Sequence, residues 1–230
     1  MSPIESNLQH VRAGINAAIA GLPQARRKPV TLVAVSKAKP VGEIRAAFAA
    51  GQRAFGENYV QEALAKIEAT TDLRQQGLSW HFIGPLQSNK AKLVAKHFDW
   101  MHAVDRLKIA EALSGYREGR PPLNVCLQIN VSGEPAKSGV TPADAPALAT
   151  QIAGLPSLTL RGLMTVIENT PDETAQRAQF RIMHQLFETM NRSGLAVDTL
   201  SMGMSHDYLV AIEEGANMVR VGSAIFGVRQ

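Results

Sequence analysis

The first segment of the chain places apolar residues at steps of three or four, which is the spacing of one helix face. These residues are Ile4, Leu8, Val11, Ile15, Ile19 and Leu22. Ser2 followed by Pro3 and Glu5 has the pattern of a capping box with proline at the first helical position. Gly21 is followed by Pro23, which is a stop signal. The pattern therefore predicts an N-terminal helix that ends at Gly21.

After this helix, short apolar runs alternate with amphipathic stretches as far as the C-terminus. The runs predict strands over residues 31–37, 54–59, 79–84, 99–105, 124–131, 160–166, 199–205 and 218–224. The stretches between them predict helices over residues 41–50, 60–70, 88–98, 106–117, 141–153, 172–191 and 207–214.

Regular alternation of strand and helix means parallel strands joined by crossover connections. An open doubly wound sheet and a closed barrel both have this pattern, and eight units favour the barrel. The predicted fold is thus a single (β/α)8 TIM barrel with an extra N-terminal helix, and residues 1–230 form one domain. We expect the extra helix to cover the end of the barrel, with a dimer contact as the alternative.

Composition agrees with an ordinary globular protein, since 45% of the residues are hydrophobic and 19% are charged. The formal net charge is +4 and the sequence pI is about 9.4, but the cations are scattered, so no nucleic-acid partner is predicted. The only cysteine, Cys126, excludes an intrachain disulfide and a cysteine-based metal site. The chain lacks a long apolar run and a signal-like start, so we expect a cytoplasmic protein without membrane contact.

In a barrel of this kind the active face lies at the carboxyl ends of the strands. The first predicted strand ends in Ser36-Lys37, a lysine after an otherwise apolar run. One interpretation is a cation that reaches solvent beyond the strand. The other is a partly desolvated amine that acts as a nucleophile toward an aldehyde. The strand alone leaves both open.

The last two predicted strands end in small residues, Ser201 to Ser205 and Gly222-Ser223. Barrels frequently bind phosphate in the loops after strands seven and eight, through exposed backbone amides. The alternative is that Gly222 and Gly227 only permit tight turns. A phosphate site here would give the amine of Lys37 a phosphorylated aldehyde as its partner.

Five blocks in this order resemble the pyridoxal phosphate homeostasis proteins, the YggS or PROSC family. The blocks are VSKAKP at residues 35–40, FGENY at 55–59, WHFIGPLQSNK at 80–90, SMGMS at 201–205 and VRVGSAIFG at 219–227. A sixth block is NVSGEPAKSG at residues 130–139. The chain also resembles the barrel domain of alanine racemase.

This resemblance implies pyridoxal 5′-phosphate (PLP) as cofactor, held as a covalent Schiff base, the internal aldimine, on Lys37. It places Ser201, Gly222 and Ser223 at the phosphate and Arg220 beside the pyridine nitrogen. A further residue, Asn58, is expected near the phenolic oxygen. The residues expected to pack the ring are Val35, Ile83 and Met202, with ordinary core packing as the alternative for these and for Asn58.

Three functions follow from these features, and we compare them by the groups each one needs. A PLP-binding protein of vitamin B6 homeostasis needs only the anchor and the phosphate site. An alanine racemase needs a second base, a tyrosine that comes from a C-terminal domain. The chain ends at Gln230, so we expect that domain to be absent, and no tyrosine here carries a matching motif. A Schiff-base aldolase usually has its lysine on strand six, and residues 160–166 contain none.

The sequence therefore predicts PLP homeostasis without robust catalysis, so no catalytic residue is assigned, and the racemase is kept as the alternative. Other B6 vitamers and PLP-dependent apo-enzymes are the expected partners, and the chain is expected to be a monomer. Three histidines at or beyond strand ends, His81, His102 and His206, are candidates for lining the pocket, but none has metal-site spacing. Three lysines, Lys39, Lys90 and Lys137, are either solvated or part of the positive field at the barrel mouth.

Overall fold

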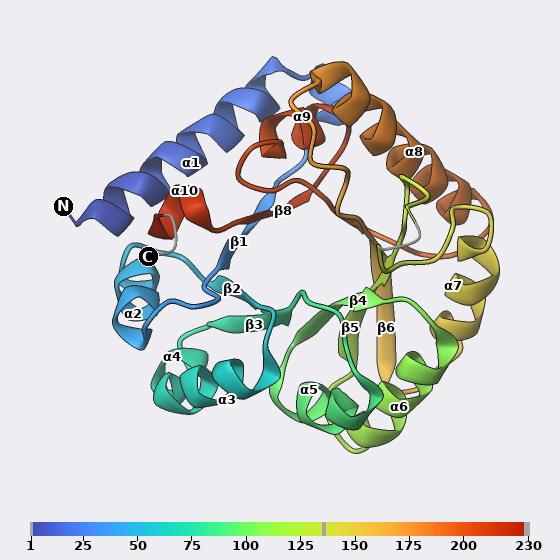
Figure 1. Cartoon of the computed structure of the whole chain (residues 1–230), viewed down its shortest axis with the longest axis horizontal. Coiled ribbons are helices and arrows are strands. Elements are labelled where there is room, and N and C mark those ends of the chain that lie inside the picture. Colours follow the sequence, from blue (N-terminus) through green and yellow to red (C-terminus); the bar gives the residue numbers. More distant parts are fainter. Residues whose placement is uncertain (1, 135–136, 228–230) are drawn as a thin grey trace.

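The computed structural model describes residues 2–134 and 137–227, and its eight parallel strands form a closed barrel in chain order (Figure 1). The strands are β1 Thr31–Val35, β2 Ala54–Glu57, β3 Ser79–Phe82, β4 Trp100–Val104, β5 Leu123–Gln128, β6 Leu158–Met164, β7 Thr199–Ser201 and β8 Met218–Val221. Strand β1 pairs with both β2 and β8, which closes the barrel. The predicted (β/α)8 fold is confirmed.

Helices follow the strands and form the outer shell of the barrel (Figure 1). They are α1 Pro3–Gly21, α2 Val41–Ala49, α3 Val60–Ala69, α4 Thr71–Arg74, α5 Ala91–His97, α6 Leu107–Arg117, α7 Ala145–Ala153, α8 Glu173–Arg192, α9 Tyr208–Glu213 and α10 Ser223–Phe226. Two 3-10 turns, η1 Gln24–Arg26 and η2 Ser88–Lys90, precede β1 and α5.

All eight predicted strands are too long at their carboxyl ends. Strand β1 ends at Val35, and Lys37 stands in the turn that follows, not at the last strand position. Strand β7 ends at Ser201, and Ser223 begins α10 instead of extending β8. The reason is that residues at the barrel mouth bend away from the ladder to form loops, although apolar residues such as Ile83, Val131 and Val166 continue past the strand ends.

Helix α1 has the predicted capping box, because Ser2 and Glu5 bond each other's backbone amides. It does not cover the end of the barrel, which corrects that expectation. It lies along the side, beside α2, α9 and α10, and buries Leu8, Val11 and Ile15 (Figure 1). Since α10 has only four residues, α1 fills the place in the shell that a full helix after β8 would take.

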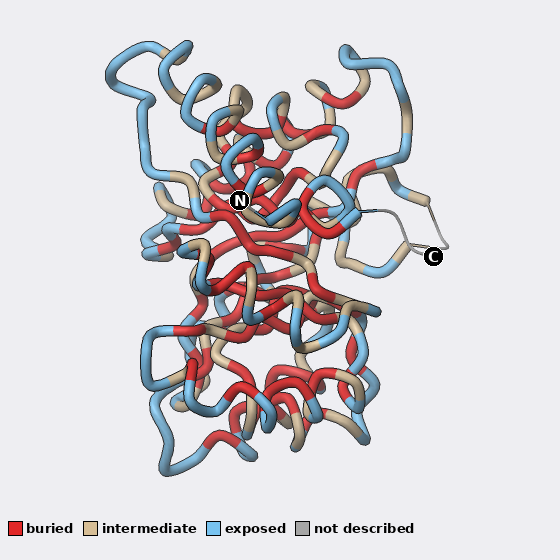
Figure 2. The backbone as a smooth tube through the Cα atoms, turned by 90° about the vertical axis from the view of Figure 1, so that its left-hand side faces the viewer, coloured by how far each residue is buried: buried red, intermediate tan, exposed pale blue. Residues whose placement is uncertain are grey.

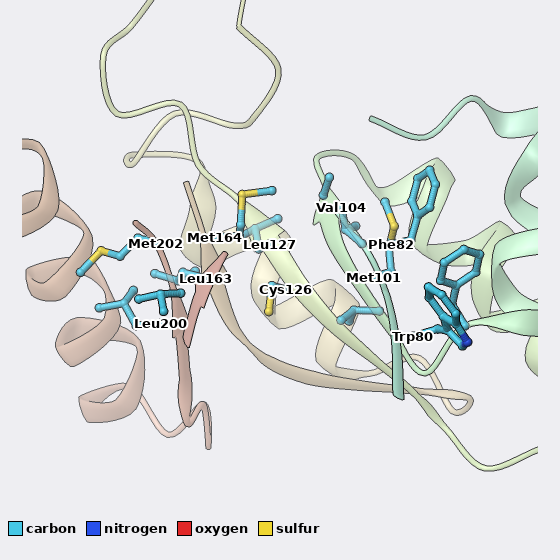
Figure 3. Close-up of a cluster of buried hydrophobic side chains, with 14 of the residues drawn as sticks. Trp80, Phe82, Met101, Val104, Cys126, Leu127, Leu163, Met164, Leu200 and Met202 are labelled. Atoms are coloured by element: carbon cyan, nitrogen blue, oxygen red, sulfur yellow. The ribbon is translucent and has the colours of Figure 1, made fainter. Parts of the chain in front are cut away.

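Alternation along the strands divides the buried side chains into two sets. The outward set packs beneath the helices and includes Trp80, Phe82, Leu200 and Met202, which Figure 3 shows in the buried cluster. Figure 2 shows this buried material through the middle of the molecule, with exposed segments at the edges. Each fully buried large side chain of this set contributes roughly 1.5–3 kcal/mol. The inward set includes a small apolar layer of Val33, Ala54 and Met218.

Cys126 lies in the barrel wall, fully buried. Burial raises the pKa of its thiol to about 12, so the thiolate that reacts with oxidants and metals is not formed at neutral pH. None of the helices within the described ranges has both the length and the apolar character of a membrane span.

Candidate functional site

A cavity of about 390 Å³ opens at the carboxyl ends of the strands, within the usual size range of small-molecule sites. Its wall comes from β1 and β8 near their carboxyl ends and from the segments that follow β1, β2, β3, β6, β7 and β8. The lining residues are Val35, Lys37, Lys39, Asn58, Ile83, Val166, Met204, Ser205, His206, Arg220, Gly222, Ser223 and Gly227. Seven of the nine residues predicted to bind the cofactor are therefore brought together in one cavity.

The other two predicted residues, Ser201 and Met202, are fully buried and are not part of the described cavity wall. Ser201 faces into the barrel below Arg220, whereas Met202 faces outward into the helix shell (Figure 3). The two residues are neighbours on an extended segment, so their side chains point to opposite sides. Contact of either residue with a bound cofactor stays a prediction.

The chain reaches the cavity again two residues later, at Met204 and Ser205. Between them and Met202 stands Gly203, with φ of +95°, a conformation that favours glycine. This bend starts the loop before α9, and His206 follows on the same loop. Met204 and Ser205 are not among the residues predicted to bind the cofactor, although both lie in the SMGMS block.

Cations dominate the polar part of the cavity wall. Lys37, Lys39 and Arg220 line it beside the imidazole of His206, and no carboxylate is present in the wall as described. Lys39 also donates from Nζ to the carbonyl oxygen of Phe226 at 2.7 Å, which ties the end of β1 to α10. A site with this charge balance favours an anionic ligand.

Backbone amides add to the attraction for an anion at the end of β8. The first amides of a helix have no acceptor in the helix itself, and in α10 these belong to Ser223 and Ala224. Gly222 precedes them, and its amide donates to Ser205 Oγ at 3.3 Å. A Cβ at Gly222 would lie 3.1 Å from the carbonyl oxygen of Val35, so glycine lets β8 approach β1 closely here.

Arg220 is 4% exposed and is held by two hydrogen bonds from inside the barrel. Its Nη1 donates to Ser201 Oγ at 2.7 Å, and its Nη2 donates to the carbonyl oxygen of Thr165 at 2.7 Å. Burial lowers the pKa of the guanidinium to about 10, so it is charged at neutral pH. Within the described ranges, no carboxylate lies within ion-pair distance of it.

A polar chain continues from Ser201 through the barrel. Ser201 Oγ lies 3.0 Å from His102 Nδ1, His102 Nε2 lies 2.9 Å from His81 Nδ1, and His81 Nε2 lies 3.1 Å from Ser79 Oγ. Arginine can only donate, so the direction that gives each hydrogen an acceptor runs from Arg220 to Ser79. Burial lowers the pKa of His81 to about 3 and that of His102 well below its ordinary value, so both imidazoles are neutral.

Asn58 offers the cavity an unused polar atom. Its Oδ1 is buried and has no hydrogen-bond partner among the described residues. The two ends of a side-chain amide can exchange by a flip, so the free atom is either an acceptor or a donor. Gly84 packs on the backbone of Asn58, and a Cβ there would lie 2.7 Å from the Asn58 carbonyl oxygen. The GEN and IGP segments are therefore fitted to each other.

Most of the other candidate histidines and lysines lie outside the cavity wall. Of the three candidate histidines, only His206 lines the cavity, since His81 and His102 face the barrel interior. Lys90 lines a neighbouring depression, and Lys137 pairs with Glu134 at 2.6 Å. The described residues include no cluster of three or more His, Cys, Asp or Glu side chains placed to hold a metal ion.

The amino-acid sequence is similar to a family of known proteins. The model of the alanine racemase N-terminal domain matches residues 7–230. A pyridoxal phosphate homeostasis protein of Pseudomonas aeruginosa is 53% identical over 232 residues, with 100% of this chain and 97% of that protein covered. The protein of the same description from Escherichia coli strain K12 is 49% identical, with 100% of this chain and 98% of that protein covered.

Solved structures agree with the sequence comparison. PipY of Synechococcus elongatus PCC7942, determined with PLP bound, has a TM-score of 0.84 and 39% identity, covering 97% of this chain and 100% of that one. Alanine racemase of Corynebacterium glutamicum has a TM-score of 0.69 and 18% identity, covering 99% of this chain and 61% of that one, which supports the fold alone. The chain belongs to the alanine racemase N-terminal domain family and, within it, to the pyridoxal phosphate homeostasis proteins.

Proposed function

We propose that this protein binds PLP in the cavity at the strand ends, holds it as a Schiff base on Lys37 and serves PLP homeostasis. The observation that carries the proposal is the make-up of the cavity wall, in which two lysines, a buried arginine and the first residue of α10 meet and the described lining includes no carboxylate. The PLP bound by PipY and the names of the relatives support the same conclusion.

The residues of the cavity fit the chemical groups of PLP. Its aldehyde condenses with a lysine amine to a Schiff base with release of one water, and its phosphate carries the negative charge that the wall attracts. We assign the phosphate to the amides of Ser223 and Ala224 and to the hydroxyls of Ser205 and Ser223. The amide atom of Asn58 at the Oδ1 position, which has no partner among the described residues, would form a hydrogen bond with a ring substituent.

Arg220 would determine the electronic state of the ring. A guanidinium donates and cannot accept, so at the pyridine nitrogen it disfavours protonation there. An unprotonated ring withdraws electrons weakly and stabilises a carbanion poorly. For this reason we propose a binding role without robust catalysis.

Racemisation remains the alternative function, and the cavity wall does not favour it. A racemase needs an acid or base on each face of the substrate carbon. The wall as described contains no tyrosine, and the side chain of Tyr59, which is 58% exposed, lines the neighbouring depression instead. His206 is the titratable wall residue that a slow side activity would use.

We propose that the protein also binds other phosphorylated B6 vitamers, because the phosphate contacts do not require the aldehyde. Delivery of PLP to apo-enzymes, a cytoplasmic location and a monomeric state complete the proposal.

The first test uses the purified protein mixed with PLP. We expect a visible absorption band that borohydride abolishes, with the mass of the reduced cofactor on the peptide that contains Lys37. In Lys37→Ala the band and the borohydride product should vanish, while binding of PLP weakens by about tenfold to a hundredfold, since the phosphate and ring contacts remain. Lys28→Ala, outside the cavity, is the control and should bind like the wild type.

Two results would overturn the proposal. One is a protein that stays colourless and unmodified with PLP, which rules out the Schiff base. The other is rapid racemisation of any member of a panel of amino acids, which replaces the binding role by catalysis. Complete loss of PLP binding in Lys37→Ala would instead contradict the assigned phosphate contacts, because these should hold PLP without the lysine.

A further inference from the structure

A buried ion cluster lies against the turn that carries Lys37, on the helix side of the barrel wall. Lys66 of α3 is 5% exposed, and its Nζ donates to Glu57 Oε1 at 2.8 Å, to Glu62 Oε1 at 2.5 Å and to the carbonyl oxygen of Ser36 at 2.7 Å. An ammonium has three donors, so all of them are used. None of these four residues is part of the cavity wall as described.

The cluster forms hydrogen bonds with the backbone on both sides of Lys37. Before the lysine, Ser36 donates from its hydroxyl to Glu57 Oε1 at 2.6 Å, and its carbonyl oxygen accepts from Lys66. After the lysine, the amide of Ala38 donates to Glu62 Oε1 at 2.6 Å. The turn itself is closed by the Lys39 amide and the Ser36 carbonyl oxygen at 3.0 Å.

The turn from Ser36 to Lys39 contains a backbone conformation that residues with a Cβ rarely adopt. Ala38 has φ of +59°, and it is the one non-glycine residue with positive φ among those described. A left-handed residue with a Cβ costs about 1–2 kcal/mol and persists where the surroundings hold it. Here the bond from the Ala38 amide to Glu62 stabilises that backbone conformation directly.

Stability alone does not account for an ion cluster at this place. Removing charges from water costs as much as a buried ion pair returns, and apolar side chains of the same volume often serve stability as well. Glu57 bears this cost, because it is fully buried, its Oε2 has no partner among the described residues and burial raises its pKa. Hydrogen bonds, unlike apolar contacts, have direction, so they fix the backbone on which Lys37 stands.

We propose that Glu57, Glu62 and Lys66 form a positioning cluster that holds the turn from Ser36 to Lys39, so that the amine of Lys37 meets an aldehyde in the cavity at a productive angle. The inference rests on the proposed function of Lys37 and deepens it. The cluster acts through the backbone and touches no part of a ligand in the cavity.

Glu62 is the member best suited to the test, because its side chain is 31% exposed and its removal does not strand a buried carboxylate. Glu62→Ala removes the acceptor of the Ala38 amide, whereas Glu62→Gln keeps a neutral acceptor there. Asp72→Ala, which removes the exposed ion pair with Arg45, is the matched control for loss of a carboxylate.

Two measurements separate positioning from binding. The rate at which the visible band appears after mixing with PLP reports attack by Lys37, and the affinity for pyridoxine 5′-phosphate, which lacks the aldehyde, reports the cavity. We expect Glu62→Ala to slow band formation by about tenfold to a hundredfold, with the affinity for pyridoxine 5′-phosphate within about twofold of the wild type. Glu62→Gln should recover most of the rate, and Asp72→Ala should change neither quantity.

Amide hydrogen exchange provides a readout that needs no cofactor. The Ala38 amide should exchange faster in Glu62→Ala than in the wild type and in Asp72→Ala. Unchanged exchange together with an unchanged rate would overturn the positioning role. So would an equal loss of rate and of pyridoxine 5′-phosphate affinity, because the cluster would then support the whole cavity. A wild-type protein that binds pyridoxine 5′-phosphate but forms no band with PLP would refute the Schiff base itself.

Discussion

The side chain of Arg220 lies between the cavity and the chain of polar side chains inside the barrel. Its side chain lines the cavity on one side and donates to Ser201 on the other. The chain behind it runs through two neutral imidazoles to Ser79, so the hydrogen-bond partners of this buried cation are dipoles, and no carboxylate of the described residues lies at ion-pair distance. A carboxylate partner would cancel the charge that the cavity presents, whereas a hydroxyl and a carbonyl oxygen orient the guanidinium and leave its charge available to an anion.

The two buried histidines make stability depend on acid. The pKa of His81 is about 3 in the folded protein and close to 6.5 when exposed, so between these values the unfolded chain binds more protons. Stability is therefore full above about pH 6.5 and falls as the pH drops toward about 3, by up to about 5 kcal/mol for this residue. Urea unfolding at a series of pH values measures the effect, and His81→Gln should flatten the curve.

The imidazole signals of the folded protein provide an independent check on the same prediction. We expect the ring protons of His81 and His102 to keep constant NMR shifts from pH 8 to about pH 5, where an exposed histidine titrates. A buried signal that titrates near pH 6.5 would contradict the neutral chain from Arg220 to Ser79.

At the scale of elements, the loop between β7 and α9 determines which side chains reach the cavity. Gly203 bends the chain there, and a Cβ on it would lie 2.7 Å from Ala211 Cβ and 2.9 Å from Tyr208 Cα. Both contacts are in or beside α9, so the glycine sets how closely this helix packs under the cavity wall. Met204 and Ser205 depend on that packing for their places.

Gly203→Ala is expected to destabilise the protein by about 2–4 kcal/mol, through positive φ and the overlap with α9. The affinity for PLP should fall as well, because Ser205 and His206 move with the loop. Gly42→Ala is the control, since a Cβ in this helix would meet nothing within 4 Å. It should stabilise the protein by about 0.5–1 kcal/mol. Urea unfolding and PLP titration measure both variants, and equal stabilities would contradict the packing argument.

Across the whole molecule, a group of arginines lies at the end of the barrel opposite the cavity. Helices in this fold run antiparallel to the strands, so their carboxyl ends and negative dipole ends gather there. Eight arginines donate to carbonyl oxygens in or next to a last helical turn: Arg12, Arg26, Arg27, Arg45, Arg53, Arg74, Arg117 and Arg120. These arginines thus have a structural role, because they satisfy carbonyl oxygens at helix ends.

Substitutions at the end of the barrel opposite the cavity should accordingly change stability and leave PLP binding unchanged. Arg117 is buried and donates to the carbonyl oxygens of Ala95, Phe98 and Pro121. Arg117→Ala should cost about 2–4 kcal/mol, because the buried carbonyl oxygens of Ala95 and Phe98 lose a charged donor. The PLP band and affinity should stay unchanged at a temperature where the variant is folded. Arg120→Ala removes one exposed contact and should cost at most about 1 kcal/mol, and a changed PLP affinity in either variant would oppose this separation.

Local patterns in the sequence determined the order of elements, because the apolar spacing of a helix or strand is set by its own residues. They also placed Lys37, Gly222 and Ser223 near one mouth, since all strands of a parallel barrel end there. Tertiary structure alone decided which side of the wall each side chain faces. Ser201 and Met202 differ by one position, and one faces the barrel interior while the other enters the helix shell.

Long-range contacts decided the rest. The pairing of Lys66 with Glu57 across 9 positions, and of His102 with Ser201 across 99, depends on strands and helices packed side by side. No local pattern carries such a contact, because each partner alone has the composition of an ordinary surface or core residue. The sequence thus determined the barrel and the position of Lys37 at its mouth, and packing decided which hydrogen bonds hold Arg220 and the turn that carries Lys37.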